Sequence, residues 1–105
     1  MIRATLQLRI RPGREADFER AWRRVAFEVR GVPGNLRQAL LRDTADPGVY
    51  TITSDWADEA SFRAFERSPE QDALTATIRA LRESAVMTVD DLLVHVDGEV
   101  PACRG

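Results

Sequence analysis

The feature that most constrains the fold is a strict alternation of apolar and polar residues near the start of the chain, over residues 2–10. The apolar positions are Ile2, Ala4, Leu6, Leu8 and Ile10. A period of two residues is typical of a β-strand with one buried face, because successive side chains of a strand point to opposite sides. The sequence therefore predicts a strand whose apolar face packs against other elements of the fold.

An amphipathic helix is predicted next, over residues 14–30. Its apolar side chains recur at a spacing that gathers them on one face of an α-helix. They are Phe18, Ala21, Trp22, Val25, Ala26 and Val29. The segment GVPG ends the helix, since Pro33 cannot continue it and Gly31 is typical of a helix C-terminus.

Two strands, residues 35–43 and 49–56, are expected to pair as an antiparallel hairpin around the turn-forming segment TADPG. The sequence leaves the register of this hairpin open. Two helix starts follow the hairpin. Asp58 can cap a short helix through its side-chain oxygen, and Ser68 followed by Pro69 has the composition of a second helix N-terminus.

The second of these helices is expected to carry an apolar stripe, and residues 86–96 to form the last strand because they are rich in β-branched residues. The stripe consists of Leu74, Ile78, Leu81 and Ala85. This order of elements predicts an α+β protein with a ferredoxin-like split βαβ topology, in which helices cover one face of a four-stranded antiparallel sheet. We expect residues 1–97 to form this single domain and residues 98–105 to form a flexible C-terminal tail. A second copy of the chain is expected to cover the open face of the sheet, which would make the protein a homodimer.

Charge and composition argue against several classes of function. The 15 basic residues are all arginines interspersed with 17 acidic residues, so the basic patch of a nucleic-acid-binding protein is missing. The sequence has no run of about 20 apolar residues that could cross a membrane, and we expect a cytoplasmic protein. Cys103 is the only cysteine and His95 the only histidine, so the sequence predicts neither an internal disulfide nor a metal site.

Several stretches of the chain together resemble the antibiotic biosynthesis monooxygenase family of dimeric α+β barrels. They are RPGREADFERAW at the first helix, VPG before the second strand, and LLRDTADPGVYTITSDWADEASFRAFERSP through the hairpin and the next helix. The most specific part is Trp56 with the acidic helix start that follows it, then Phe62, Ser68 and Pro69. The resemblance extends over residues 2–97.

This resemblance implies a ferredoxin-like protomer with a pocket between sheet and helices, and two protomers that close into a barrel. Some family members are small oxygenases that act on anthrones, quinols and similar aromatics without metal or bound cofactor. Others degrade heme, act with flavin or have no demonstrated activity. The anthrone oxygenases carry an asparagine and a tyrosine where this chain has Ile52 and Phe62, so two polar groups are missing. The heme-degrading branch needs a histidine after the SP turn, and residues 70–85 contain none.

The candidate pocket wall is aromatic and apolar, because aromatic faces stack on flat ligands. It comprises Trp22, Ile52, Trp56, Phe62, Phe65 and Ile78. Ordinary core packing at the junction of strand and helix is the alternative interpretation of these residues. Tyr50 and Ser54 share a strand face with Ile52 and Trp56, so all four are expected to point the same way.

The candidates for chemistry are polar. Tyr50 or His95 would take a substrate proton beside Trp56, and Arg37 or Arg42 would hold an oxyanion. Each has a simpler interpretation: a tyrosine packed on the sheet, a histidine at the surface or a dimer interface, and arginines that are solvated or form salt bridges between subunits.

The sequence thus predicts a small homodimeric monooxygenase that oxidises an electron-rich anthrone, phenol or quinol of polyketide type with O2, in secondary-metabolite biosynthesis and without a bound cofactor. Free reduced flavin is an alternative co-reactant. A second hypothesis is a polyketide cyclase or isomerase, which the apolar residues at positions 52 and 62 favour. A third is a non-catalytic accessory dimer that binds an aromatic ligand.

Overall fold

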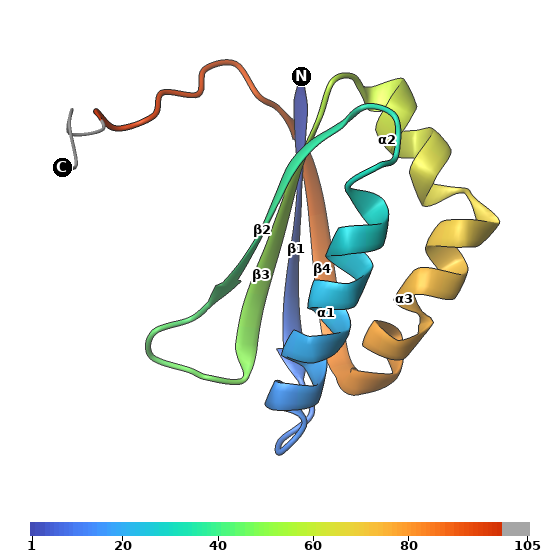
Figure 1. The fold of residues 1–105 in the computed structure, drawn as a ribbon. Helices are drawn as coiled ribbons and strands as arrows, with labels where there is room; N and C mark the ends of the chain where they lie inside the picture. The colour runs from blue at the N-terminus through green and yellow to red at the C-terminus, as the bar shows by residue number, and fades with distance from the viewer. Residues whose placement is uncertain (100–105) are drawn as a thin grey trace, which may run out of the picture.

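The computed structural model describes residues 1–99, which form a four-stranded antiparallel sheet with three helices on one face (Figure 1). In chain order the elements are β1 (Ile2–Ile10), α1 (Glu15–Val29), β2 (Asn35–Arg42), β3 (Val49–Trp56), α2 (Glu59–Glu66), α3 (Pro69–Leu81) and β4 (Arg82–Asp91). The strands lie in the order β2-β3-β1-β4, so β1 and β3 are central. This arrangement confirms the predicted ferredoxin-like α+β fold.

The two predicted helix starts after the hairpin are confirmed by their hydrogen bonds. The backbone N–H of Ser61 donates to Asp58 Oδ1 at 2.7 Å, which caps α2. The backbone N–H of Gln71 donates to Ser68 Oγ at 3.1 Å, and Pro69 occupies the first turn of α3. Both caps satisfy backbone donors that a helix N-terminus otherwise leaves without partners.

A glycine holds the loop after α1 against α2. Gly34 has a φ of +88°, a conformation that favours glycine, and a Cβ there would lie 2.4 Å from Ser61 Cβ. The carbonyl of Gly34 accepts a hydrogen bond from the N–H of Ala57 at 2.8 Å. The VPG segment therefore ends α1 and also fixes how closely the loop approaches the start of α2.

The last strand lies earlier in the chain than the sequence predicted. β4 begins directly at Arg82, four residues before the predicted start at 86, and ends at Asp91. Pairing with β1 sets both limits, because β4 runs along the whole of β1 and Ile2 faces Asp91. Beyond that point one more backbone hydrogen bond forms, from the N–H of Leu92 to the carbonyl of Met1 at 2.9 Å; residues 92–96 are not a strand, and the chain leaves the sheet (Figure 1). Of the predicted flexible tail, residues 100–105 lie outside the described residues.

The apolar face of β1 is buried as predicted, but in two separate clusters. One cluster lies around Leu8 and Ile10 and the other around Ile2 and Ala4. Between them Leu6 is only half-buried and pairs across the sheet with Ile52 of β3. The core is therefore interrupted at the centre of the sheet, below the helices. Within residues 1–99, the helices are too short or too polar for any of them to span a membrane.

Candidate functional site

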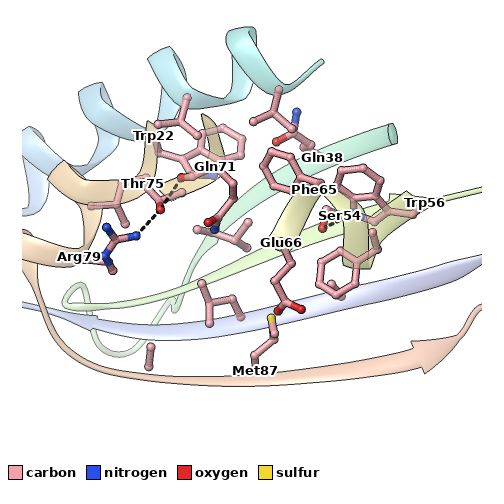
Figure 2. Close-up of a pocket in the computed structure, with 18 of the residues that line it drawn as sticks. Trp22, Gln38, Ser54, Trp56, Phe65, Glu66, Gln71, Thr75, Arg79 and Met87 are labelled. Atoms are coloured by element: carbon pink, nitrogen blue, oxygen red, sulfur yellow. Dashed lines mark hydrogen bonds between the residues drawn. The ribbon is translucent and has the colours of Figure 1, made fainter. Parts of the chain in front are cut away.

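A cavity of about 410 Å³ lies at the interruption between the two core clusters, between the sheet and the three helices, and is open to solvent on one side (Figure 2). The residues that line it include all six of the predicted wall residues, namely Trp22, Ile52, Trp56, Phe62, Phe65 and Ile78. These residues come from α1, β3, α2 and α3, so the fold brings together side chains that are far apart in the sequence.

Trp56 is the fixed centre of the aromatic part of the wall. Its ring stacks on Phe65 with centroids 5.3 Å apart and planes inclined by 28°, and it meets Phe62 at 5.7 Å and 59°. Its indole Nε1–H donates to Ser54 Oγ at 3.0 Å. Because the indole donor already has a partner, Trp56 contributes an aromatic surface, while the Ser54 hydroxyl keeps its own hydrogen for a ligand.

The cavity also has a polar side, of which sequence reasoning identified only Ser54. It comprises Gln38, Ser54, Glu66, Gln71, Thr75, Arg79 and Arg82. Gln71, Thr75 and Arg79 recur every four residues along α3, which places them on one face of that helix. This spacing was the only indication in the sequence of a polar pocket wall on α3. Taken alone, it is equally typical of a solvated helix face.

Arg79 is held in place by its own helix. Its Nη1 donates to Thr75 Oγ1 at 2.6 Å, and its Nη2 donates to the carbonyl of Asp72 at 3.1 Å and forms an exposed ion pair with Asp72 Oδ1 at 3.2 Å. Thr75 Oγ1 in turn donates to the carbonyl of Gln71 at 2.8 Å. Figure 2 shows Arg79 at one end of the cavity and the pair of Trp56 and Ser54 at the other. The cavity thus offers a flat aromatic wall and an anchored cation.

Tyr50 shares the strand face of Ile52 and Trp56, as predicted, but lies in the core cluster beside Phe18 and not on the cavity wall. Its hydroxyl donates to Glu19 Oε2 at 2.6 Å. Burial, followed by the hydrogen bond to Glu19, raises the pKa of Tyr50 to about 12. Arg42 contacts the same Glu19 oxygen at 3.5 Å, so both residues belong to a network beside α1.

Arg37 lies on the opposite face of the sheet from the helices. Its Nη1 donates to Asp55 Oδ2 at 2.8 Å, and Arg3 binds the same carboxylate through Nε at 2.7 Å and Nη2 at 3.0 Å. Asp55 is 1% exposed. The hydrogen bonds from Arg3 hold the pKa of Asp55 below its ordinary value, and Arg37 adds to the effect.

His95 lies in the segment after β4. It is exposed, and its Nε2 contacts Asp97 Oδ1 at 2.8 Å. It is not on the wall of the cavity around Trp56. Among residues 1–99, side chains of His, Cys, Asp and Glu nowhere gather in a group of three or more that could hold a metal ion.

Fold and cavity together define an α+β protein of the ferredoxin-like type with a ligand-sized aromatic pocket between sheet and helices. The family model described as antibiotic biosynthesis monooxygenase matches residues 1–77, and the chain belongs to this family. The fold is also that of a variant of SnoaB, a cofactor-independent oxygenase from Streptomyces nogalater, with a TM-score of 0.83 and 22% identity over 92% of this chain and 97% of that one. A conserved protein from Methanosarcina mazei has the same fold, with a TM-score of 0.77 and 16% identity over 84% of this chain and 88% of that one.

Two Streptomyces proteins are similar in sequence. Protein SchA of Streptomyces halstedii is 33% identical over 69 residues, which is 66% of this chain. The 42.8 kDa protein in the whiE locus of Streptomyces coelicolor is 28% identical over 102 residues, or 96% of this chain. The chain spans only 18% and 25% of the lengths of these relatives, so the similarity concerns one part of each.

Proposed function

We propose that this protein is a small oxygenase that oxidises a flat, electron-rich aromatic of polyketide type, such as an anthrone, phenol or quinol, with O2 and without a bound cofactor. The observation that carries the proposal is the cavity, in which the stacked rings of Trp56 and Phe65 lie opposite an anchored arginine, Arg79. Family membership and the shared fold with the oxygenase SnoaB support the reaction class.

The size and surface of the cavity fit such a substrate. Its volume of about 410 Å³ lies within the range of about 300–1,000 Å³ that is usual for small-molecule pockets. Flat rings bind well against tryptophan and phenylalanine, because offset stacking adds to the gain from burying apolar surface. A bound ring system would displace water from the apolar wall, which strengthens the attraction between an ionised substrate and the guanidinium of Arg79.

The reaction needs no reductant from outside. When an anthrone and O2 give an anthraquinone and water, the methylene carbon loses both of its C–H bonds and gains a carbonyl oxygen. The substrate gives up four electrons, and O2 accepts all four as one oxygen atom enters the carbonyl group and the other leaves in water. The protein has to remove a proton and stabilise the resulting anion, and Arg79 provides the positive charge for the second task.

The test is oxygen uptake by the purified protein with an anthrone or a dihydronaphthoquinone, with and without free reduced flavin. We expect uptake without flavin, and a loss of kcat/KM of about 10- to 100-fold in Arg79→Gln, which is the usual worth of a charged hydrogen bond. Arg24→Gln, on the exposed side of α1, is the matched control and should behave like the wild type. Uptake that requires flavin would refute the cofactor-free reaction.

A cyclase or isomerase is the second candidate. Ile52 and Phe62 are both on the cavity wall, at positions where the related anthrone oxygenases carry polar residues, so the cavity is more apolar than an anthrone oxygenase resemblance implies. Product formation from a polyketide intermediate under nitrogen would favour this candidate. Tight binding without turnover in air or nitrogen would indicate an accessory ligand-binding protein instead.

A further inference from the structure

The proposed reaction needs a proton acceptor, and the predicted ones lie away from the cavity. Tyr50 donates its proton to Glu19 in the core, and His95 contacts Asp97 after β4. The titratable side chains that the structure places on the cavity wall are Glu66, Arg79 and Arg82. Arginine stays protonated in proteins, so of these three only the carboxylate of Glu66 can accept a proton.

Glu66 is the last residue of α2, and its carboxylate is only partly engaged. Its Oε1 accepts a hydrogen bond from Arg63 Nη1 at 2.9 Å. Within residues 1–99, Oε2 has no hydrogen-bond partner. Figure 2 shows the side chain extending from α2 toward the sheet, where Met87 of β4 lies. A carboxylate has about four acceptor positions, so the bond from Arg63 orients Glu66 and leaves Oε2 open to a ligand.

We propose that Glu66 is the catalytic base of the oxygenase, an inference that rests on the function proposed above. In the step it performs, the acidic O–H or C–H bond of the bound aromatic breaks, the proton moves to Glu66 Oε2 and the electron pair stays on the substrate. The side chain is 32% exposed, so the proton can pass on to solvent water.

The charges around Glu66 suit this transfer. Arg63, on the same helix, binds Glu66 Oε1 and is not among the residues that line the cavity. Arg79 of α3 and Arg82 of β4 line the same cavity and favour the substrate anion that remains. The proton acceptor and the cations therefore come from different elements, and the substrate anion forms between them.

A purely structural role for Glu66 makes a different prediction, and Glu59 distinguishes the two. Glu59 also accepts a hydrogen bond from Arg63, at 3.3 Å, but is 59% exposed and does not line the cavity. If Glu66 served only as a partner of Arg63, the variants Glu59→Gln and Glu66→Gln would behave alike, because such pairs near the surface contribute little.

The first experiment measures kcat/KM for oxygen uptake against pH in the wild type and in Glu66→Gln, Glu66→Asp and Glu59→Gln. At neutral pH we expect Glu66→Gln to lose about 10²- to 10⁴-fold, as is usual when a general base is removed. The loss should shrink as pH rises and the substrate ionises in solution, Glu66→Asp should keep part of the activity, and Glu59→Gln should follow the wild type. A Glu66→Gln rate within twofold of the wild type across the pH range would overturn the proposal.

The second experiment is independent of turnover. The phenol 2-hydroxyanthraquinone is already oxidised and changes its visible absorbance when it ionises, so its ionisation midpoint can be measured while bound. A carboxylate beside the phenol opposes ionisation, so Glu66→Gln should lower the midpoint by about one pH unit and Glu59→Gln should leave it unchanged. An unchanged midpoint in Glu66→Gln, or failure of the dye to bind the wild type, would overturn the proposal. A shifted midpoint in a protein that consumes no O2 would keep Glu66 at the site and refute the oxygenase.

Discussion

The carboxylate of Asp55 is expected to stabilise the sheet more than any surface ion pair of this chain. Three hydrogen bonds of 2.7–3.0 Å reach it from Arg3 and Arg37, and it is 1% exposed, whereas the two arginine side chains are 37% and 47% exposed. Asp55→Asn keeps one acceptor oxygen but removes the charge. The arginines can partly return to water, which offsets some of the loss.

The expected cost of Asp55→Asn is therefore near that of one charge-assisted hydrogen bond, about 2 kcal/mol, and not the sum of three. For a domain of this size that corresponds to a decrease in Tm of about 10 °C. The assay is urea and thermal unfolding at one fixed protein concentration, because self-association would make the apparent stability depend on concentration.

The pH dependence of this effect has a definite sign. The arginines lower the pKa of Asp55 in the folded protein. The contribution of Asp55 to the free energy of unfolding is therefore fully present above its pKa in the unfolded chain, about 3.9, and is lost as pH falls through its lower pKa in the folded protein. The stability difference between wild type and Asp55→Asn should thus be complete at pH 7 and should narrow below about pH 4.

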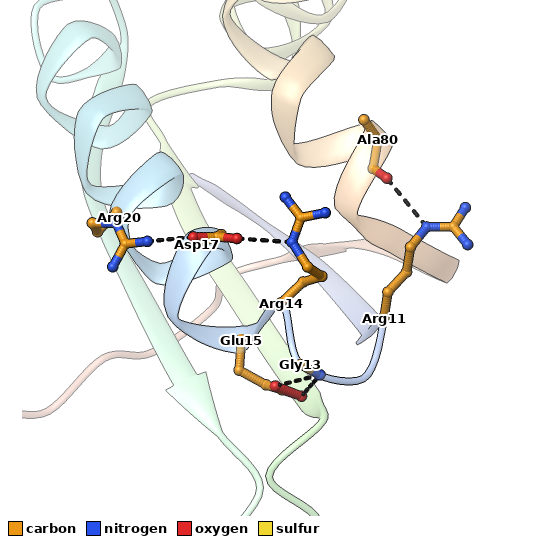
Figure 3. A network of polar contacts seen from close by, with 7 residues as sticks. All are labelled: Arg11, Gly13, Arg14, Glu15, Asp17, Arg20 and Ala80. Atoms are coloured by element: carbon orange, nitrogen blue, oxygen red, sulfur yellow. Dashed lines mark hydrogen bonds and ion pairs between the residues drawn. The ribbon is translucent and has the colours of Figure 1, made fainter.

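Asp17 provides the matched control, since it also lies between two arginines but on the surface (Figure 3). Arg14 Nε donates to Asp17 Oδ2 at 2.8 Å and Arg20 binds the other oxygen, yet the Asp17 side chain is 40% exposed. Asp17→Asn should leave the unfolding midpoint unchanged within error. An Asp55→Asn protein as stable as Asp17→Asn at pH 7, or a difference that stays constant down to pH 2, would refute the reasoning.

Two further predictions concern packing. Gly34→Ala should destabilise the fold by about 3 kcal/mol in urea unfolding, because the new Cβ would meet Ser61 as well as adopt a positive φ. Gly13→Ala has a φ of +84° but open space around it, so it should cost only about 1 kcal/mol, and equal losses would contradict this account. We propose that the protein is a homodimer in which the exposed apolar residues Leu93 and Val96 cover a second copy. Light scattering at micromolar concentration should give twice 11.8 kDa, and truncation after residue 91 should give a monomer.

The fold could be predicted from the sequence wherever the signal is local. The alternation over residues 2–10 and the caps at Asp58 and Ser68 require only neighbours in the chain, and all three are confirmed. The boundary between α3 and β4 is different. The β-branched composition begins only at Val86, whereas the start of β4 at Arg82 is set by pairing with the far end of β1, which no short window of sequence reveals.

The candidate site, like the fold, could be predicted only in part. The wall around Trp56 could be predicted because large aromatic residues at the junction of strand and helix are either core or pocket, and here they are both. The polar side could not be predicted, because Glu66 and Arg79 have the sequence context of ordinary solvated helix residues. Only the position of α2 and α3 over the sheet brings them to the cavity. Tyr50 was predicted to line the pocket and does not. It lies on the expected face of β3, but its position along the strand places it in the core cluster with Phe18.

The interruption in the core explains why a domain this small has room for a substrate. Leu6 and Ile52 face each other at the middle of the sheet and stay half-buried, while the neighbours of Leu6 on the same face of β1, Ala4 and Leu8, belong to the two clusters. Protein interiors are close-packed, so a cavity between sheet and helices gives up packing contacts that would otherwise stabilise the fold. The same cavity is lined by stacked aromatics and anchored polar groups, a composition typical of small-molecule sites, and the oxygenase proposed above would bind its substrate there.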